Sequence, residues 1–240
     1  MHRLAALLAL IATAEAPIMA APPFDPARDY ITPGQDEPGY RAWARADPAR
    51  APAVAAYYAF LAQNGVIGIV PTWQLLRTAT DWQRCAAQPF EVPPPELWAH
   101  VLETLAYIRA HIVPVIGPVE PVSVYRNPAL NACAGGAPES AHQSLFAIDL
   151  VPLRPTDRAG LIRGVCAIHQ WRGSGYDVGL GFYKGLRFHV DSKKFRKWGG
   201  GGESSPCEVV GSNPLRSEQT HPTPGNTPPA EAVIPLGAPH

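Results

Sequence analysis

The chain has 240 residues, of which 46% are hydrophobic and 17% are charged, and its formal net charge at pH 7 is zero. A chain of this size and composition can bury one sizeable core, so we expect one domain with additional segments at its ends. The balanced charge and the lack of a long basic stripe give nucleic-acid binding little electrostatic support.

The N-terminal stretch MHRLAALLALIATAEAPIMAAPP has the pattern of a secretory signal. Arg3 supplies a short positive region, an apolar run follows over residues 4–13, and Ala20 or Ala21 offers a small-residue cleavage site. The run is too short to span a bilayer, which takes roughly 20 apolar residues. We therefore predict a signal peptide at residues 1–21 and a secreted or periplasmic protein that has no stable membrane insertion after cleavage. The alternative is a frayed apolar N-terminus.

Residues 22–93 are predicted to form an irregular and helical N-terminal extension. Residues 22–50 are rich in Pro, Ala, Asp and Arg and are expected to follow the surface irregularly. The alanine-rich stretch 51–65 predicts a helix. The stretch 71–85 predicts a second helix, with Pro71 in its first turn.

The segment 94–198 is predicted to be the core of the protein. Its first part, 94–113, has apolar residues at three- and four-residue steps, which predicts a helix with one buried stripe. His100 and His111 lie on this helix and are expected at its surface or rim rather than in a set of ligands. The stripe consists of Leu97, Val101, Leu102, Leu105, Ile108 and Ile112.

After this helix the pattern changes to short β-branched and alternating runs, which predict strands. Between the last two runs, 156–171 predicts a helix that begins at Thr156 or Asp157 and in which His169 has a structural role. The glycines of 173–181 lack the strand-then-helix context of a dinucleotide-binding loop and predict a turn into a strand. The three predicted strand-forming runs are 121–128, 146–153 and 186–192.

Residues 199–240 are rich in Gly, Pro, Ser and Thr. This composition predicts a mostly disordered tail, apart from the stretch tethered by Cys207. Nothing in the chain after the signal resembles a transmembrane helix.

The chain contains four cysteines and no C-x-x-C pair, which argues against a cysteine zinc site. In an oxidising compartment two disulfides are expected, with three possible connectivities. Of these we favour Cys85–Cys133 together with Cys166–Cys207. The alternative is four buried free thiols.

The stretch SAHQSLFAID, residues 140–149, places His142 and Asp149 seven positions apart. On a helix seven residues rise about 10.5 Å, so the two side chains would not converge. A loop that leads into a strand can instead bring Asp149 back beside His142, and the glycines before the motif favour this arrangement. The plainer alternative is that Asp149 caps a turn and His142 lies on a surface loop.

A catalytic zinc ion usually takes three protein ligands and keeps one position open for water. The later stretch FHVD offers His189 as a third ligand. Alternate residues of a strand face the same way, so Asp191 is expected to point into the same site.

Other residues around these complete a recognisable pattern. It consists of Tyr-Arg, an Asn a few residues on, Gly-Gly, S-x-H with A-x-D after it, and a later H-x-D strand. Over roughly residues 95–198 the chain thereby resembles the zinc-dependent D-alanyl-D-alanine peptidases, which cut peptidoglycan peptides as carboxypeptidases or murein endopeptidases. The matching residues are Tyr125, Arg126, Asn131, Gly135, Gly136, Ser140, His142, Ala147, Asp149, His189 and Asp191.

The resemblance implies an α+β fold of the hedgehog/DD-peptidase type, with a small antiparallel sheet that carries the zinc site and packs against helices. It implies that Arg126 holds a carboxylate or carbonyl of the substrate, a task suited to a guanidinium fork. Tyr125 and Ser140 would be further substrate-binding residues. The alternative role for Arg126 is a surface salt bridge. The implied ligands of the single Zn²⁺ ion are His142, Asp149 and His189.

Two positions depart from the family pattern. Leu145 stands where the family has a glycine, at a turn where glycine's freedom at positive φ is useful. Leu186 stands three residues before the last histidine, where related enzymes often carry an acid. Asp191 is the replacement candidate, either as the general base or as a carboxylate that orients His189, and Glu139 is a weaker candidate.

The activity that we expect from these residues is hydrolysis of D-amino-acid-containing stem or cross-link peptides of the cell wall by a monomeric zinc metallopeptidase. Zinc lowers the pKa of its bound water from ~15.7 toward ~7. Asp191 is expected to accept the water proton, and Arg126 to position the substrate or stabilise the oxyanion. One alternative is a catalytically weak or inactive module that only binds wall peptide, which Leu145 and Leu186 favour. Another is a disulfide-bonded structural domain with incidental histidines.

Overall fold

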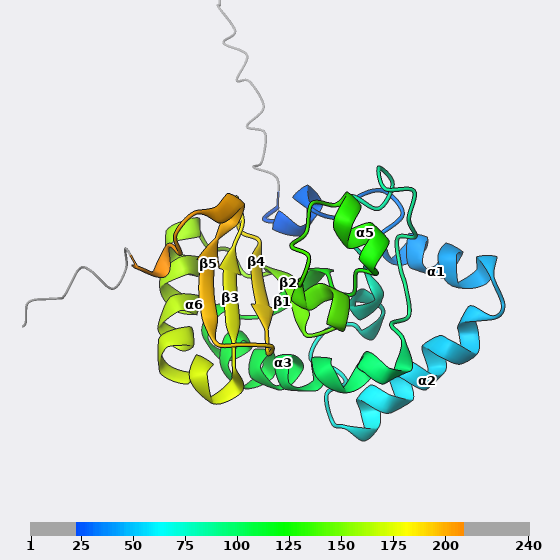
Figure 1. Cartoon of the computed structure of the whole chain (residues 1–240), viewed down its shortest axis with the longest axis horizontal. Coiled ribbons are helices and arrows are strands. Elements are labelled where there is room, and N and C mark those ends of the chain that lie inside the picture. Colours follow the sequence, from blue (N-terminus) through cyan, green and yellow to red (C-terminus); the bar gives the residue numbers. More distant parts are fainter. Residues whose placement is uncertain (1–22, 209–240) are drawn as a thin grey trace, which may run out of the picture.

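In the computed structural model, which describes residues 23–208, the chain forms an α+β structure around a five-stranded sheet (Figure 1). The strand order is β1-β2-β4-β3-β5, so β2 and β4 lie side by side at the centre. The strands are Val119–Ser123 (β1), Ala147–Pro152 (β2), Gly179–Phe182 (β3), Phe188–Asp191 (β4) and Arg196–Gly199 (β5). The expected runs 146–153 and 186–192 are therefore confirmed as strands. The run expected at 121–128 is confirmed only in part, because β1 spans 119–123 and residues 124–128 are not in a strand.

The sheet is mixed rather than antiparallel, which corrects the expectation from the sequence. The pairs β1–β2, β2–β4 and β3–β4 are antiparallel, whereas β3 and β5 are parallel. The short connection 192–195 reverses the direction of the chain after β4, and β3 lies between β4 and β5. A strand that runs opposite to β4 at this position must run parallel to β3.

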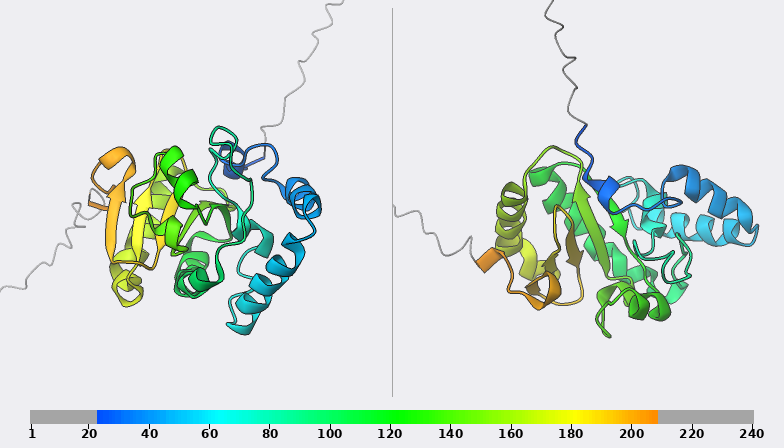
Figure 2. Two further views of the ribbon diagram at one scale, coloured as in Figure 1. Left: turned by 45° about the vertical axis from the view of Figure 1, so that its right-hand side comes forward. Right: turned by 90° about the horizontal axis from the view of Figure 1, so that it is seen from above.

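Helices lie on two opposite sides of this sheet. Helices α1 and α2 lie together at the end of the molecule opposite α6, with the sheet between them (Figures 1 and 2). Helix α6 confirms the predicted helix 156–171, and the Asp157 carboxylate caps it by accepting from the Gly160 amide at 2.6 Å. The helices are Glu37–Ala46 (α1), Arg50–Gln63 (α2), Val101–Tyr107 (α3), Val113–Ile116 (α4), Pro128–Cys133 (α5) and Arg158–Arg172 (α6). The short 3-10 turns are Pro26–Asp29 (η1), Thr72–Leu76 (η2), Pro95–His100 (η3), Ala141–Ser144 (η5), Gly173–Tyr176 (η6) and Gly200–Gly202 (η7).

The predicted helix 94–113 is confirmed in position but changes its winding along its length. It begins as η3, continues as α3, passes through the π-helical turn Ile108–Ile112 (η4) and ends as α4. The helical run continues without a break through Pro114 to Ile116, beyond the predicted end. Four of the six predicted stripe residues are fully buried, namely Val101, Leu105, Ile108 and Ile112.

The N-terminal extension is more regular at its start, and less helical later, than the sequence suggested. Helix α1 forms within the stretch expected to be irregular, and α2 confirms the helix predicted at 51–65. The helix predicted at 71–85 is wrong, because only η2 forms there. Beyond η2, Arg77 pairs with Phe90 in an isolated antiparallel bridge, and its carbonyl accepts from the Val124 amide at 2.9 Å. These pairings need an extended backbone, so tertiary contacts override the local helix propensity.

The Arg77 side chain ties the extension to the sheet. Its guanidinium is 1% exposed and donates to the Gln35 carbonyl, to the Glu120 carboxylate and to the Pro121 carbonyl at 2.7–2.9 Å. A continuous cluster of buried apolar side chains runs from Trp43 in α1 to Val190 in β4. The extension therefore shares one core with the strands.

Helix α3 holds the ends of the two central strands in place. The Thr104 hydroxyl donates to the Phe146 carbonyl at 2.6 Å, immediately before β2, and lies 2.8 Å from the Ser192 hydroxyl, immediately after β4. Because all three groups are at least partly buried, these bonds set how far β2 and β4 extend.

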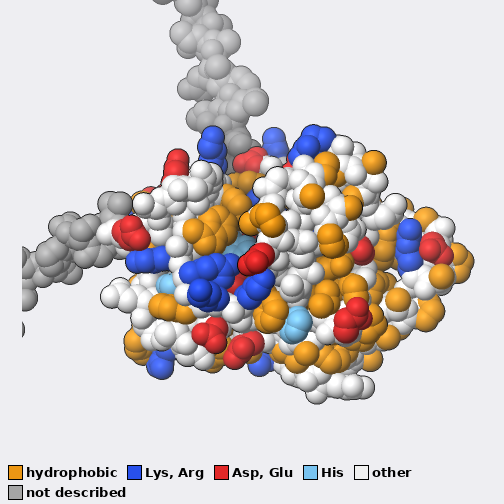
Figure 3. Space-filling model, viewed as in Figure 1, with side chains coloured by type: hydrophobic (Ala, Val, Ile, Leu, Met, Phe, Trp, Pro, Cys, Tyr) orange, Lys and Arg blue, Asp and Glu red, His pale blue; other side chains and the backbone are white. Residues whose placement is uncertain are grey.

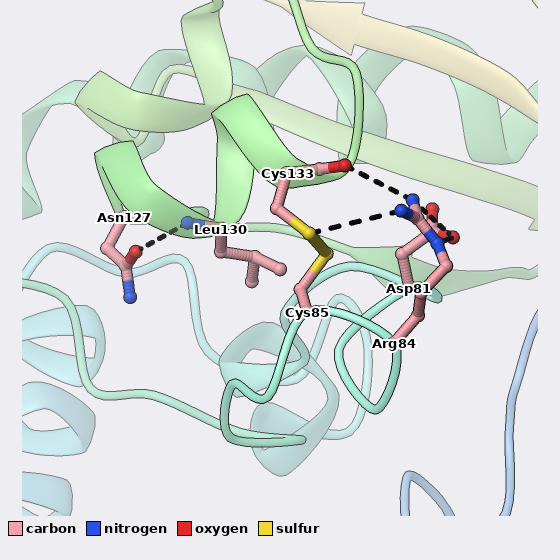
Figure 4. The surroundings of a disulfide bond; sticks show 6 residues. All are labelled: Asp81, Arg84, Cys85, Asn127, Leu130 and Cys133. Atoms are coloured by element: carbon pink, nitrogen blue, oxygen red, sulfur yellow. Dashed lines mark hydrogen bonds and ion pairs between the residues drawn. A yellow bond between two sulfur atoms is a disulfide. The ribbon is translucent and has the colours of Figure 1, made fainter.

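Two disulfides join Cys85 to Cys133 and Cys166 to Cys207, with Cα–Cα distances of 5.8 and 5.4 Å, and no cysteine is free. This confirms the favoured pairing. The first bond fastens α5 to the loop after η2, where Arg84 also donates to the Cys133 carbonyl at 3.2 Å (Figure 4). The second fastens the last described residues to α6.

We expect the four thiols to be inaccessible to alkylation in protein taken from an oxidising compartment. Mass spectrometry after iodoacetamide treatment should show no modified cysteine before reduction and four after it. Four modified thiols in the unreduced protein would contradict both the pairing and the expected compartment.

Within residues 23–208 no helix is long and apolar enough to cross a membrane. The signal peptide expected at 1–21 lies outside the described residues, as does the tail from 209 onward. The predicted start of the tail, 199–208, is described and includes η7 and the disulfide-bonded Cys207.

Candidate metal centre

Three metal-ligand side chains from separate parts of the chain converge beside the central strands. His142 lies in η5, Asp149 in β2 and His189 in β4, where the register places Asp149 directly opposite His189. One ligand atom from each residue lies within 4.8 Å of the other two. All three residues are buried, with exposed fractions of 1%, 0% and 3%. The convergence that the spacing predicted is therefore confirmed.

Both histidine rings are anchored through the nitrogen that points away from the group. His142 Nδ1 lies 2.6 Å from the Val124 carbonyl, and because a carbonyl only accepts, Nδ1 must carry the proton. His189 is anchored in the opposite sense, with Nε2 2.8 Å from an oxygen of Asp191. His142 Nε2 and His189 Nδ1 therefore turn toward the same carboxylate oxygen, Asp149 Oδ1, at 3.2 and 3.0 Å.

This arrangement calls for a cation between the three groups. A neutral imidazole whose proton is used elsewhere presents a lone pair to the Asp149 carboxylate, and the two negative centres repel in a buried site. Burial and the nearby Arg126 charge lower the pKa of His142 to about 4, so this ring is neutral near pH 7. A metal ion removes this repulsion at His142, whereas His189 must release a proton before it binds the ion.

The other two ligands differ in how tightly they hold protons. Burial alone would raise the pKa of Asp149, but its interactions with His142, Arg187 and Arg126 outweigh burial and hold that pKa well below its usual range. Burial lowers the pKa of His189, whereas its hydrogen bonds to Asp149 and Asp191 outweigh burial and raise it. Asp149 is thus an ionised ligand, and His189 is the ligand most easily protonated.

The donor set of two imidazoles and one carboxylate fits zinc. With bonds of about 2.0–2.1 Å, tetrahedral geometry places two ligand atoms ~3.3 Å apart, and the observed separations from Asp149 Oδ1 are 3.2 and 3.0 Å. Figure 3 shows a histidine at the floor of a hollow that is bordered by apolar side chains and by Lys and Arg. Three protein ligands are typical of catalytic zinc, which keeps a fourth position for water.

Asp191 lies behind His189 rather than beside the other ligands. Oδ2 accepts from His189 Nε2 and forms an ion pair with Arg196 Nη2 at 2.8 Å. Oδ1 accepts from Arg196 Nη1 at 2.9 Å and from the Lys193 amide at 3.0 Å. These bonds lower the pKa of Asp191 to about 2 although burial alone would raise it. Of the two roles that we considered for Asp191, this geometry favours the orientation of His189.

The remaining residues of the motif take varied positions around the group. Arg126 is 7% exposed and donates to Asp149 Oδ2 at 2.6 Å and to the Ser123 hydroxyl at 2.8 Å, so it braces the carboxylate. Ser140 caps the turn that carries His142. Tyr125 is packed in the main apolar core with 5% of its surface exposed.

Two residues that we did not assign from the sequence also contact the group. The Tyr183 hydroxyl lies 3.2 Å from Asp149 Oδ1, and Arg187 Nη2 lies 3.6 Å from Asp149 Oδ2. The sequence signal for Arg187 is the strand period, because residues 187, 189 and 191 share one face of β4.

Glycines of β3 make room for the outer part of the site. A Cβ at Gly179 would overlap the Asp191 carboxylate, and a Cβ at Gly181 would overlap the ring of Trp198. The Trp198 ring thus lies across the strand with its centre 5.3 Å from that of His189. Two glycines read from the sequence only as a turn into a strand are needed for these close approaches.

Leu145 occupies the turn position where the related family has glycine, and its backbone is left-handed with φ 58°. The positive φ inferred from the family pattern is therefore present in this chain. The Leu145 side chain is fully buried in the main core, which offsets the backbone strain.

We expect Leu145→Gly to destabilise the protein. Losing a buried leucine side chain costs about 2–5 kcal/mol, whereas relief of the left-handed backbone returns roughly 1–2 kcal/mol. The net loss of about 1–3 kcal/mol should appear as a lower Tm in thermal unfolding. Leu145→Ala keeps the strain and should be less stable than Leu145→Gly. A glycine variant that is more stable than the parent would contradict this account.

Zinc affinity should fall with decreasing pH because His189 must lose a proton to bind the ion. The raised pKa of His189 makes this the first competing protonation, while His142 and Asp149 stay in their binding forms down to about pH 4. Below the pKa of His189 the apparent zinc Kd should therefore rise about tenfold per pH unit, as expected for one released proton. Competition with a chromophoric chelator measures this slope. A pH-independent affinity, or a two-proton slope above about pH 5, would contradict the assignment.

Comparisons of the chain with known protein families, with curated proteins and with solved structures found no match. The likeness to the D-alanyl-D-alanine peptidases rests on the motif residues themselves. Of these, the structure brings His142, Asp149 and His189 into one buried group.

Proposed function

We propose that the protein is a secreted or periplasmic zinc metallopeptidase that hydrolyses D-amino-acid-containing stem or cross-link peptides of peptidoglycan. The observation that supports this most strongly is the buried His142–Asp149–His189 group, in which two anchored imidazoles face one ionised carboxylate. The two disulfides are consistent with an oxidising compartment.

The residues divide the work around the ion. Bound zinc supplies a Lewis acid for the scissile carbonyl and lowers the pKa of water toward ~7. Arg126 keeps Asp149 ionised and oriented, and we assign to it also the positioning of the substrate carbonyl or carboxylate. Asp191 orients His189 and raises its basicity, as a carboxylate behind a metal-binding histidine usually does.

The residue that accepts the proton from water is the hardest part of the mechanism to assign in this chain. Leu186, at the position of the family acid, is packed against the apolar core. Glu139 is the candidate that remains. It is exposed, and its carbonyl accepts from Lys193 Nζ at 3.0 Å, so the segment before η5 lies against the connection after β4.

The surroundings of Leu186 and Asp191 favour a second candidate function, a module that binds wall peptide without cutting it. Leu186 cannot take a proton, and both oxygens of Asp191 are engaged by other groups. A binding module would keep the ion and the peptide affinity but would show no turnover.

Digestion of purified peptidoglycan sacculi separates the two functions. The zinc-loaded protein should release muropeptides whose masses identify the cut bond, and chelation should stop the release. Binding to sacculi with no change in the muropeptide profile would support the binding module instead. Zinc-free protein with the same activity would contradict the proposal.

A further inference from the structure

The guanidinium of Arg187, at the edge of the metal group, has a donor nitrogen without a hydrogen-bond partner among the described residues. This nitrogen is Nε, and it is buried. The ionic contact of Arg187 with the metal group, Nη2 to Asp149 Oδ2, is 3.6 Å long, which is beyond a hydrogen bond. A buried donor without a partner is rare in a folded protein, so the position calls for an additional acceptor.

Aromatic rings hold this guanidinium in place. The Arg187 Cζ lies 3.8 Å from the centre of the Tyr183 ring and 5.6 Å from that of Tyr30. Tyr30 is itself fixed, because its hydroxyl donates to the Lys184 carbonyl at 2.8 Å. The ring contacts and a side-chain hydrogen bond with Tyr183 orient the guanidinium, while the Nε–H donor stays available.

Arg187 is not required to hold Asp149. Arg126 already donates to Asp149 Oδ2 at 2.6 Å, and Oδ1 faces both histidines and the Tyr183 hydroxyl. The side chain of Arg187 is also 18% exposed, whereas that of Asp149 is 0% exposed. Arg187 therefore reaches the mouth of the site, where a ligand can meet it.

The charges in contact with the two carboxylates favour an anion. Three guanidinium groups, those of Arg126, Arg187 and Arg196, contact Asp149 and Asp191. The group is thus positive before a divalent ion is added. A planar guanidinium matches a carboxylate best, because two of its N–H groups can bond in parallel.

We propose that Arg187, held by Tyr183 and Tyr30, binds a carboxylate of the substrate beside the metal position. The ligand is a peptide with a free carboxylate on the residue that follows the scissile bond. This inference rests on the proposed function for the identity of the ligand as a peptide, but the recognition of the carboxylate can be measured without turnover.

The test compares acetyl-D-Ala-D-Ala with its C-terminal amide on the zinc-loaded full chain. Binding is measured by calorimetry, or by kcat/KM where the probe is cleaved. The parent should prefer the free acid by about tenfold or more, as expected for a charge-assisted pair. Arg187→Met should lower the preference to about one, acting on the acid and not on the amide, with the zinc content unchanged. Arg187→Lys should restore only part of the preference, because an ammonium lacks the planar fork.

Lys184→Met is the matched control, since Lys184 is an exposed cation in the same β3–β4 connection. It should change neither probe by more than about twofold, the size expected for a solvent-screened charge. Loss of zinc in Arg187→Met, an equal loss for acid and amide, or no preference in the parent would each overturn the inference. An Arg187-dependent preference without cleavage of sacculi would support this inference while the peptidase proposal fails. Cleavage of sacculi without such a preference would support the peptidase proposal and overturn the inference about Arg187.

Discussion

His142→Ala is expected to lower zinc affinity by more than about 100-fold and to abolish peptidase activity. Even the partners that only orient a metal ligand are worth about 10–100-fold in affinity, and His142 supplies one of three ligand atoms directly. The ring is buried and its Nε2 lies 3.2 Å from the Asp149 carboxylate, so a side chain at the protein surface cannot replace it as a ligand. Zinc content after dialysis, measured by atomic emission, should fall from about one ion per chain to nearly none.

His111→Ala is the control for this experiment. His111 is half-buried on the π-helical turn η4 and lies outside the metal group. It should retain both zinc and activity. Thermal unfolding of each protein in the presence of a chelator separates loss of the ion from loss of the fold. Unchanged zinc content in folded His142→Ala protein would show that the three residues do not form a metal site.

Asp191→Asn is expected to weaken zinc binding by about 10–100-fold, with activity returning when zinc is saturating. The carboxylate accepts from His189 Nε2 at 2.8 Å and from Arg196 Nη1 at 2.9 Å, and it forms an ion pair with Arg196 Nη2 at 2.8 Å. Asparagine has one acceptor oxygen where two are in use, so the ring of His189 loses part of its anchor. The measurements are zinc affinity by chelator competition and turnover as a function of free zinc.

The opposite outcome would support the role that we first expected for Asp191. A general base is usually worth about 10²–10⁴-fold in turnover, so loss of activity at that level with zinc still bound would make Asp191 the proton acceptor. Asp177→Asn is the isosteric control, because Asp177 is an exposed carboxylate in a left-handed turn that asparagine tolerates. Full activity of Asp191→Asn at ordinary zinc would exclude both roles and direct the search to Glu139.

The residue types and local arrangement of the candidate ligands could be predicted from the sequence, and the resemblance to the D-alanyl-D-alanine peptidases joined His189 to His142 and Asp149. Strand alternation placed His189 and Asp191 on one face of a strand, and a loop before a strand brought His142 back to Asp149. The helix at 156–171 was predicted to begin at Thr156 or Asp157, and Asp157 caps it. In each case the neighbours that decide the conformation lie within a few residues along the chain.

The predictions from the sequence were wrong where backbone or side-chain groups that are distant along the chain decide the local conformation. The helix expected at 71–85 is absent because Arg77 pairs with Phe90 and its guanidinium bonds to Gln35 and Glu120, none of which is visible in the local pattern. The parallel pairing of β5 depends on β3 lying between β4 and β5, which is a property of the whole sheet.

By itself, then, the sequence determined which side chains of this protein can hold a metal ion, since residue type and period are local properties. It did not determine what each of the surrounding charges does. Asp191 faces the back of His189, and Arg187 reaches the mouth of the site against Tyr183. Those roles were decided only when β4 packed between β2 and β3, because hydrogen-bond partners in a folded chain come from strands and loops that are remote in sequence.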